Sequence, residues 1–98
     1  MRSVDPAEAA AAYRQGAAFV DVRTGPQHAR DGLIGSQSLP LDAIQAGRTP
    51  SGVDPDQPVY LLCDRGQISE LAGLYLEQAG FRDVANVRGG LASLRKLL

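Results

Sequence analysis

Cys63 is the only cysteine among the 98 residues, and this narrows the chemistry it can do. A lone thiol excludes an internal disulfide, a zinc site built from cysteines and a Cys-x-x-Cys redox pair. Cys63 follows an apolar run and precedes a glycine-bearing turn that leads into a helical segment. Free cysteines are often ordinary core residues, so two interpretations stay open: a small buried hydrophobe or a reacting thiolate.

The segment after Cys63 is suited to hold an anion. Ligands of open α/β sheets bind outside the carboxyl ends of the strands. A turn that enters a helix also points successive backbone N–H groups into one concavity. Here the anion would be the thiolate itself or a persulfide formed on it. Gly66 fits a tight turn because glycine accepts positive φ, so we expect the loop backbone to matter more than its side chains.

The elements that must position Cys63 alternate between helix and strand. Capping residues, glycine stops and apolar periodicity predict helices over residues 7–15, 24–30, 40–46, 68–79 and 91–98. Short apolar, β-prone runs predict strands over residues 17–22, 33–39, 59–62 and 84–87, with Phe81 leading into the last. This alternation indicates right-handed crossovers and a parallel α/β sheet.

One helix is predicted to lie directly on the sheet, because its apolar residues recur at helical spacing. The expected packing face consists of Ile68, Leu71, Ala72, Tyr75 and Ala79. Tyr60 is also expected to be a packing residue and Tyr13 a half-buried one. His28, the only histidine, lies on a short polar segment and is expected at the surface.

The composition describes one domain with a nearly neutral charge balance. Ten basic and eleven acidic side chains leave no basic field, so nucleic acid and acidic membrane surfaces are not expected partners. No apolar run approaches the roughly 20 residues of a membrane span, and no signal peptide is recognisable. We expect a single cytoplasmic domain over residues 1–98, and the initial methionine favours a complete protein.

Several short motifs in a fixed order resemble the rhodanese-like domain family across essentially the whole chain. They are Asp21-Val22-Arg23, Gly35-Ser36 before Leu39-Pro40, Cys63-Asp64-Arg65-Gly66, Ala79-Gly80-Phe81 and Val87-Arg88-Gly89-Gly90. The resemblance implies a three-layer α/β domain with a five-stranded parallel sheet flanked by helices. It also implies a six-residue active loop, Cys63 to Ile68, and transfer of a sulfane sulfur through a cysteine persulfide. No metal or cofactor is expected.

The resemblance carries roles over to particular residues. Cys63 corresponds to the nucleophile, and Asp21 and Arg23 to a supporting pair that lies near the loop. An acidic and a basic residue at a strand end also fit a plain ion pair. The residues that correspond to the cradle around the thiol are Asp64, Arg65, Gly66, Gln67, Ile68 and Ser69.

The sequence departs from the family pattern at several positions. Gly32 stands where many relatives have histidine, and the region of Leu94 lacks a common tryptophan. Ile68 occupies a loop position that is often arginine in the family. The opposite charges of Asp64 and Arg65 are expected to cancel near the thiol. Alternatively, the two side chains only form a solvated surface of the loop. A dianion would gain little net attraction there, so we predict a persulfide or polysulfide donor in preference to thiosulfate.

Three function classes compete. The first is a sulfurtransferase that passes sulfur from Cys63 to an external acceptor, which would be cyanide, a small thiol or a partner protein's cysteine. An external acceptor is needed because the chain has no second cysteine. The second is a non-catalytic, protein-binding or regulatory module of the same fold. The third, a phosphatase or arsenate reductase, needs an arginine six positions after the cysteine, and Ser69 stands there.

Overall fold

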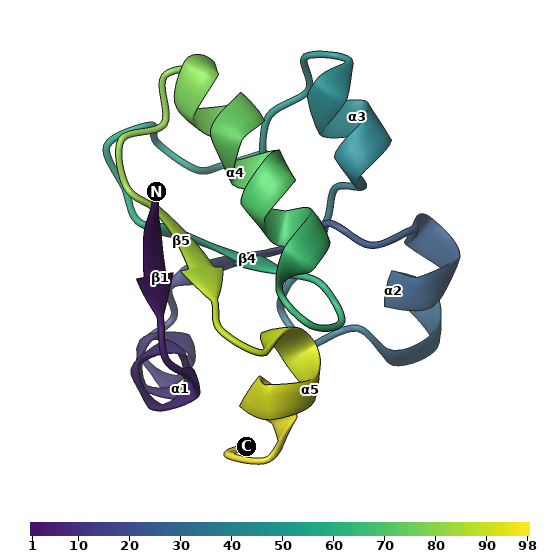
Figure 1. The fold of residues 1–98 in the computed structure, drawn as a ribbon, viewed down its shortest axis with the longest axis vertical. Helices are drawn as coiled ribbons and strands as arrows, with labels where there is room; N and C mark the ends of the chain where they lie inside the picture. The colour runs from purple at the N-terminus through teal and green to yellow at the C-terminus, as the bar shows by residue number, and fades with distance from the viewer.

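The structure is a computed structural model that describes residues 1–98. Five strands and five helices follow one another in alternation (Figure 1). The strands are β1 (Arg2–Val4), β2 (Ala18–Asp21), β3 (Gln37–Ser38), β4 (Val59–Leu62) and β5 (Val84–Val87). The helices are α1 (Pro6–Arg14), α2 (Gly25–Asp31), α3 (Leu41–Gln45), α4 (Gln67–Gln78) and α5 (Gly90–Arg95).

The five strands form one parallel sheet in the order β1-β5-β4-β2-β3. Strand β4 lies at its centre between β5 and β2, and all four of its residues are buried. A strand covered on both faces has to be continuously apolar, and Val-Tyr-Leu-Leu meets that demand. The predicted α/β class with a five-stranded parallel sheet is confirmed.

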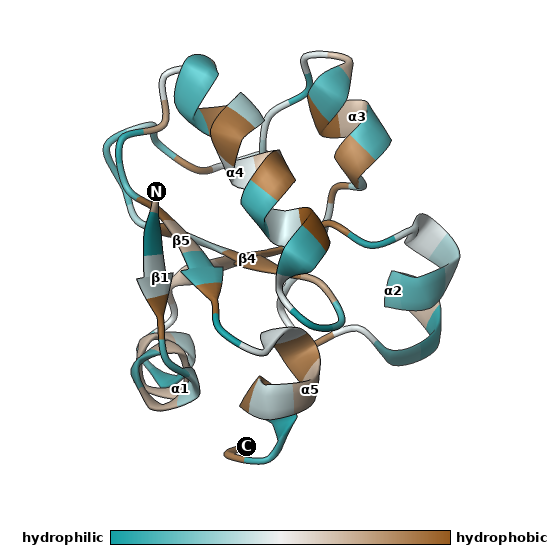
Figure 2. Cartoon of the chain, viewed as in Figure 1, coloured by the Kyte–Doolittle hydropathy of each residue, from teal (hydrophilic) through white to brown (hydrophobic).

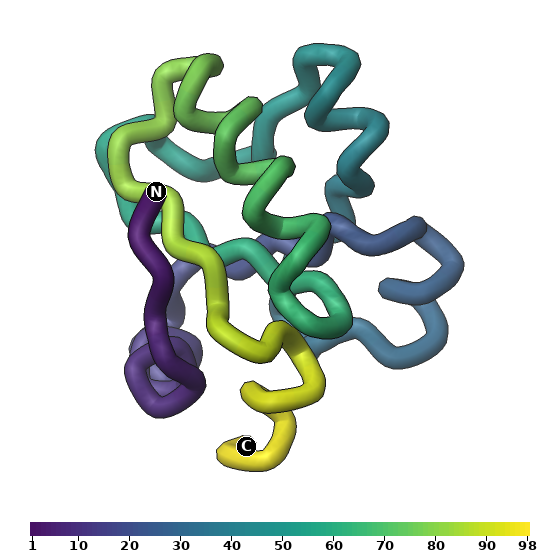
Figure 3. Tube along the Cα trace, in the orientation of Figure 1, coloured from purple at the N-terminus to yellow at the C-terminus, as the bar shows by residue number.

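Each face of the sheet carries its own hydrophobic core, which gives the domain three layers. One face packs against α3 and α4, through Ile44, Ala72 and Leu76. The opposite face packs against α1 and α5, through Ala9, Ala10, Leu91 and Leu94. The tube in Figure 3 shows the helices of the two pairs side by side, α3 with α4 and α1 with α5.

Local sequence signals explain where two of the helices begin. The Asp5 side chain accepts a hydrogen bond from the Glu8 backbone N–H, and Pro6 occupies the first turn of α1. Thr24 and Gln27 form a reciprocal capping box at the start of α2. No helix of the chain is long and apolar enough to cross a membrane.

The predicted packing face of α4 is wrong. Ala72 is buried as expected, but Ile68, Leu71 and Tyr75 are 48%, 42% and 37% exposed, and Ala79 is exposed as well. The buried residues are Ser69, Ala72, Gly73 and Leu76. The physical reason is close packing: small residues let the helix backbone approach its neighbours, so the larger apolar side chains point outward. Figure 2 shows hydrophobic bands along the whole helix.

The strand predictions need two corrections. Residues 33–39 form only a two-residue strand, because Leu33 and Ser36 close a turn and Leu39 then bonds to the Asp21 carbonyl. Strand β1 was not expected from its residues. Only Val4 of its three residues is buried, so the pattern is too short to show a period. It adds to the sheet through pairing with β5.

Candidate active site

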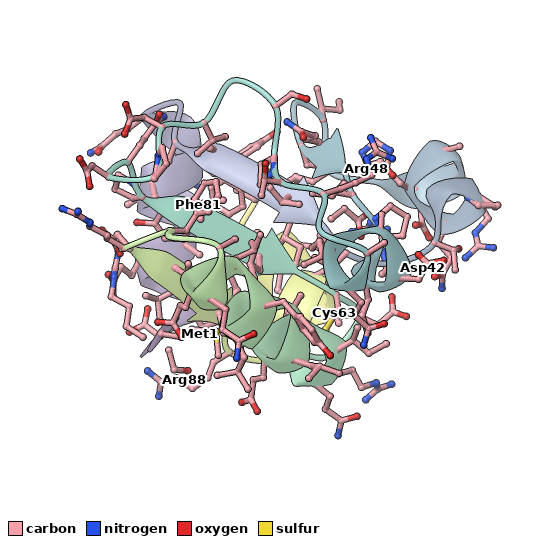
Figure 4. All side chains as sticks on the ribbon, turned by 90° about the horizontal axis from the view of Figure 1, so that it is seen from above. Met1, Asp42, Arg48, Cys63, Phe81 and Arg88 are labelled. Atoms are coloured by element: carbon pink, nitrogen blue, oxygen red, sulfur yellow. The ribbon has the colours of Figure 1, made fainter.

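Cys63 follows directly after β4, at the carboxyl edge of the central strand. Its side chain is 2% exposed and belongs to the core between the sheet and α4. In Figure 4 Cys63 lies inside the outline of the molecule, where β4 meets the active loop. The active loop, Cys63 to Ile68, runs into α4, whose first residue is Gln67. Figure 3 shows it curling beside the start of α5.

Two groups lie within hydrogen-bond distance of the sulfur. The Gly66 backbone N–H donates to Cys63 Sγ across 3.0 Å, and Ser69 Oγ lies 3.4 Å from the same atom. Gly66 has φ of 89°, in the left-handed region that glycine tolerates. A Cβ at Gly66 would also come within 3.1 Å of the Val87 carbonyl oxygen. The left-handed backbone of Gly66 thus places its N–H toward the sulfur, at a position where a side chain would be both strained and crowded.

The buried side chain of Asn86 on β5 hydrogen-bonds to the active loop. Asn86 Nδ2 donates to the Gly66 carbonyl across 3.1 Å and to Glu70 Oε1 across 3.4 Å. Its Oδ1 accepts a hydrogen bond from the Ser69 hydroxyl. Asn86 is 4% exposed and Ser69 is fully buried, so the bonds of Asn86 to Ser69 and Gly66 are shielded from water, whereas its bond to Glu70 is part-buried. The sulfur, Ser69 and Asn86 form one connected polar chain.

The start of α5 holds the loop from another side. The Leu91 N–H donates to the Cys63 carbonyl across 2.8 Å, and the Ala92 N–H donates to the Asp64 carbonyl across 3.3 Å. Gly90 makes this approach possible, with φ of 63°. A Cβ there would lie 2.5 Å from the Cys63 carbonyl oxygen and 2.7 Å from the Arg65 nitrogen. The loop is thus joined to β4 and α4 at its two ends, and hydrogen bonds from β5 and α5 fix its backbone.

Asp21 and Arg23 form a buried ion pair next to the loop. Arg23 Nη2 lies 2.9 Å from Asp21 Oδ2, and the two side chains are 4% and 0% exposed. The same guanidinium reaches Asp31 at 3.0 Å and Asp64 at 3.2 Å. The hydrogen bond to Asp21 raises the pKa of Arg23 above its ordinary value. The hydrogen bond from Arg23 lowers the pKa of Asp31 below its ordinary 3.8.

The prediction that Asp64 and Arg65 neutralise each other is corrected by this network. The Asp64 carboxylate pairs with Arg23, whereas no carboxylate lies within ion-pair distance of Arg65. Both side chains line a cavity of about 260 Å³ above the sulfur, together with Cys63, Gln67 and Ile68. Arg65 is the only cation lining that cavity. A second cavity of about 300 Å³ also shares Asp64 and Arg65 and is lined further by Arg23, Asp31 and Arg95.

The histidine and tyrosine predictions have mixed outcomes. His28 is half-buried rather than a surface residue, because its Nε2 lies 3.1 Å from the Ser36 carbonyl oxygen. Tyr13 is half-buried, as predicted. Tyr60 is buried and stacks on Phe19 with ring centroids 4.9 Å apart, whereas Tyr75 points outward.

Three residues that surround the candidate site were not predicted from the sequence: Asn86, Gly90 and Asp31. Asn86 did leave a signal, since it is the only polar residue in the apolar strand Val84–Val87. Gly90 belongs to a recognised turn, but the closeness of that turn to Cys63 is a property of the folded chain. Asp31 reaches Arg23 across eight positions of sequence, and no spacing rule predicts that contact.

This arrangement suits nucleophilic chemistry of sulfur at one buried atom. The Gly66 backbone N–H donates a hydrogen bond to Sγ, and the cavity above the sulfur has room for a small molecule. Position 69 is a serine, so the site lacks the arginine guanidinium that would bind a phosphoryl oxyanion. No group of three or more His, Cys, Asp and Glu residues gathers to bind a metal ion.

Comparison with known proteins agrees with the fold and with the motifs. The rhodanese-like domain family matches residues 5–96. Thiosulfate sulfurtransferase GlpE of Pseudomonas fluorescens strain SBW25 is 34% identical over 89 residues, which are 91% of this chain and 80% of that protein. GlpE of Pseudomonas syringae pv. syringae is 36% identical over 89 residues, 91% of this chain and 82% of that protein.

Solved structures show the same architecture. A rhodanese homolog from the extremely thermophilic bacterium Thermus thermophilus is 35% identical, with a TM-score of 0.73 over 95% of this chain and all of that one. A rhodanese-like domain protein from Staphylococcus aureus is 26% identical, with a TM-score of 0.81 over 96% of this chain and 91% of that one. The strand order, the motifs and these similarities together establish that the chain belongs to the rhodanese-like domain family.

Proposed function

We propose that this protein is a rhodanese-type sulfurtransferase that carries sulfur as a persulfide on Cys63. The observation that carries the proposal is the setting of its one thiol: at the end of β4, bonded by the Gly66 N–H and open to a cavity of about 260 Å³. Relatives named thiosulfate sulfurtransferase, at 34–36% identity, support the same reaction class.

The reaction proceeds in two displacements. The Cys63 thiolate attacks the sulfane sulfur of the donor, and the donor's sulfur bond breaks. The bonding pair leaves with sulfite when thiosulfate is the donor, or with a thiolate when a persulfide is the donor. An external thiolate or cyanide then attacks the outer sulfur, and the Cys63 Sγ–S bond breaks to restore the thiolate. The acceptor is external because the chain has no second cysteine.

We propose a persulfide or polysulfide as the preferred donor, with thiosulfate as a weaker one. The cavity over Cys63 offers a dianion one cation, Arg65, and the Asp64 carboxylate on its wall is only partly compensated, because Arg23 also pairs with Asp21 and Asp31. Its rim is apolar at Ile68, which suits the hydrocarbon part of a thiol carrier. The expected result is a higher kcat/KM with glutathione persulfide than with thiosulfate at equal ionic strength. A lower KM for thiosulfate than for glutathione persulfide would overturn the preference.

A protein or peptide that presents the acceptor thiol is a further part of the proposal. Four apolar side chains on the outer side of α4 form the α4 patch: Ile68, Leu71, Leu74 and Tyr75, which are 37–53% exposed. Ile68 also lines the cavity over Cys63, so the patch continues from the sulfur to the surface. Four side chains fall short of the roughly 800 Å² per partner of a stable interface, which fits a transient contact with an acceptor.

The α4 patch can be tested with a synthetic peptide that carries one cysteine between leucines, compared with glutathione as acceptor. The wild type should prefer the peptide, and Leu71→Glu should remove that preference without changing transfer to cyanide. Leu97→Glu is the matched control, since Leu97 is 44% exposed and lies beyond α5. Equal use of peptide and glutathione by the wild type would contradict an acceptor contact at this patch.

The alternative function is a binding module without chemistry. Mass spectrometry after incubation with thiosulfate, polysulfide or glutathione persulfide separates the two functions. Wild type should gain the mass of one sulfur atom, and Cys63→Ser should gain none. Failure of the wild type to gain sulfur from any of the three donors would leave the binding module as the better description.

A further inference from the structure

The hydrogen-bond directions behind Cys63 are fixed by the groups at their ends. The Gly66 carbonyl and the Glu70 carboxylate can only accept, so the amide nitrogen of Asn86 must face them. The amide oxygen therefore faces Ser69 and can only accept. The Ser69 hydroxyl has one proton, and that proton is given to Asn86.

This direction decides what Ser69 can offer to the sulfur. With its proton on Asn86, Ser69 Oγ can only accept from Cys63 Sγ, 3.4 Å away. A protonated thiol satisfies that contact, because its S–H donates to Ser69. A thiolate does not, because a serine lone pair would then face a negative sulfur. The hydroxyl can turn to the thiolate only by leaving the buried Asn86 oxygen without a donor.

We propose that Asn86 is a positioning residue that controls the protonation of Cys63 through the Ser69 hydroxyl. Asn86 keeps the serine proton away from the sulfur, and so it favours the states in which Sγ is neutral. These states are the resting thiol and the persulfide, whose charge lies on the outer sulfur. When the thiol ionises, its proton leaves to solvent, and the thiolate keeps the Gly66 N–H as its hydrogen-bond donor.

Other charges around Cys63 come from every element packed near the loop. They are Asp21 at the end of β2 and Arg23 just after it, Asp31 of α2, Asp42 of α3, Asp64 and Arg65 of the loop, Glu70 of α4 and Arg95 of α5. Substitutions at Asn86 and Ser69 change none of these charges. The proposal rests on Cys63 as the reacting thiol, but its readout needs no sulfur donor, so it can fail separately from the proposed activity.

The test is the rate of alkylation of Cys63 by iodoacetamide as a function of pH. Asn86→Leu removes the amide oxygen and frees the Ser69 hydroxyl for the thiolate. In this variant the midpoint of the curve of alkylation rate against pH should fall by about one pH unit. At a pH well below both midpoints, the variant should then react roughly tenfold faster than the wild type. Ser69→Ala alone should lower the midpoint by less than Asn86→Leu does, because it removes the lone pair that faces the thiolate but supplies no hydrogen-bond donor.

The double variant distinguishes this role from simple loosening of the loop. In the Ser69→Ala background, Asn86→Leu should leave the midpoint unchanged, because the hydroxyl through which it acts is absent. A shift of equal size in both backgrounds would overturn the proposal, and so would a rise of one pH unit or more in Ser69→Ala alone. Asn86→Ala serves the same purpose if the leucine variant does not fold, as judged by circular dichroism.

Discussion

On its inner side the active loop touches the sheet and α5, and on its outer rim it meets solvent. The inner contacts come from Gly66 and from residues outside the loop that bond to its backbone or approach it closely: Asn86, Gly90, Leu91 and Ala92. On the rim, Arg65, Gln67 and Ile68 are exposed, and their side chains make no hydrogen bond to the rest of the protein. The inner side therefore sets the position of the sulfur, while the rim is free to select what reaches it.

The largest effect should come from removing the cation that supports the loop. Arg23→Leu leaves the fully buried Asp21 carboxylate without its partner and releases Asp64. A broken buried pair costs about 3–5 kcal/mol, so the free energy of unfolding in urea should fall by that amount. Arg30→Leu is the control, because the Arg30 side chain is 68% exposed and should tolerate the change. Equal losses in both variants would show that burial of the pair is unimportant.

Gly90→Ala should damage the inner side almost as strongly. The new Cβ would lie 2.5 Å from the Cys63 carbonyl oxygen at a residue with φ of 63°. We expect a loss of about 2 kcal/mol or more in stability and a large loss of sulfur transfer.

Gly16→Ala provides the matched control for Gly90→Ala. Gly16 has φ of 84°, but no atom lies within 4 Å of an added Cβ. The control should therefore show only the backbone strain, about 1–2 kcal/mol, with activity retained. Similar activity losses in the two variants would mean that contact with the loop is not the cause.

Changes on the rim should affect turnover and leave stability unchanged. Arg65→Gln removes the only cation in the cavity over Cys63, so kcat/KM for thiosulfate should fall about tenfold, or about 1.4 kcal/mol. The urea midpoint should stay at its wild-type value. Arg88→Gln, at an exposed position after β5 that Figure 4 labels, should change neither quantity. A lower urea midpoint for Arg65→Gln would place Arg65 with the supporting residues instead.

The smallest effect should be the one that depends on pH. The pKa of Asp31 is lowered by its hydrogen bond with Arg23, so the ionised form stabilises the folded state. That contribution is present above the ordinary pKa near 3.8 and is lost as the pH falls through the lowered value. Asp31→Asn should therefore have a lower urea midpoint than the wild type at pH 7, and the two should converge at strongly acid pH. A difference that persists there would point to a cause other than ionisation.

The sequence was sufficient where one local pattern determines one local structure. The alternation of elements, the apolar run before Cys63 and the glycine after it predicted the sheet class and the place of the thiol. The pairing of Asp21 with Arg23 could also be predicted, because residues two positions apart at the end of a strand lie close together. The roles assigned to Cys63 and to the cradle residues stay predictions until they are tested.

The remaining features depend on contacts between distant segments. The face of α4 was mispredicted because the pattern of large apolar residues does not show that Ala72 and Gly73 permit closer packing. The partner of Asp64 is Arg23, 41 residues away, although Arg65 is adjacent in sequence. Asn86 lies 17 residues from Ser69, and no periodicity joins the two.

The burial of Cys63 has a consequence for selectivity toward oxidants and other thiols. With 2% of the residue exposed, the empty protein offers little sulfur surface to a passing disulfide. On the proposed function, the outer sulfur of a persulfide lies one S–S bond length, about 2.05 Å, beyond the covered Cys63 Sγ. We therefore expect an acceptor thiol to react with the persulfide more readily than a disulfide reacts with the resting thiol.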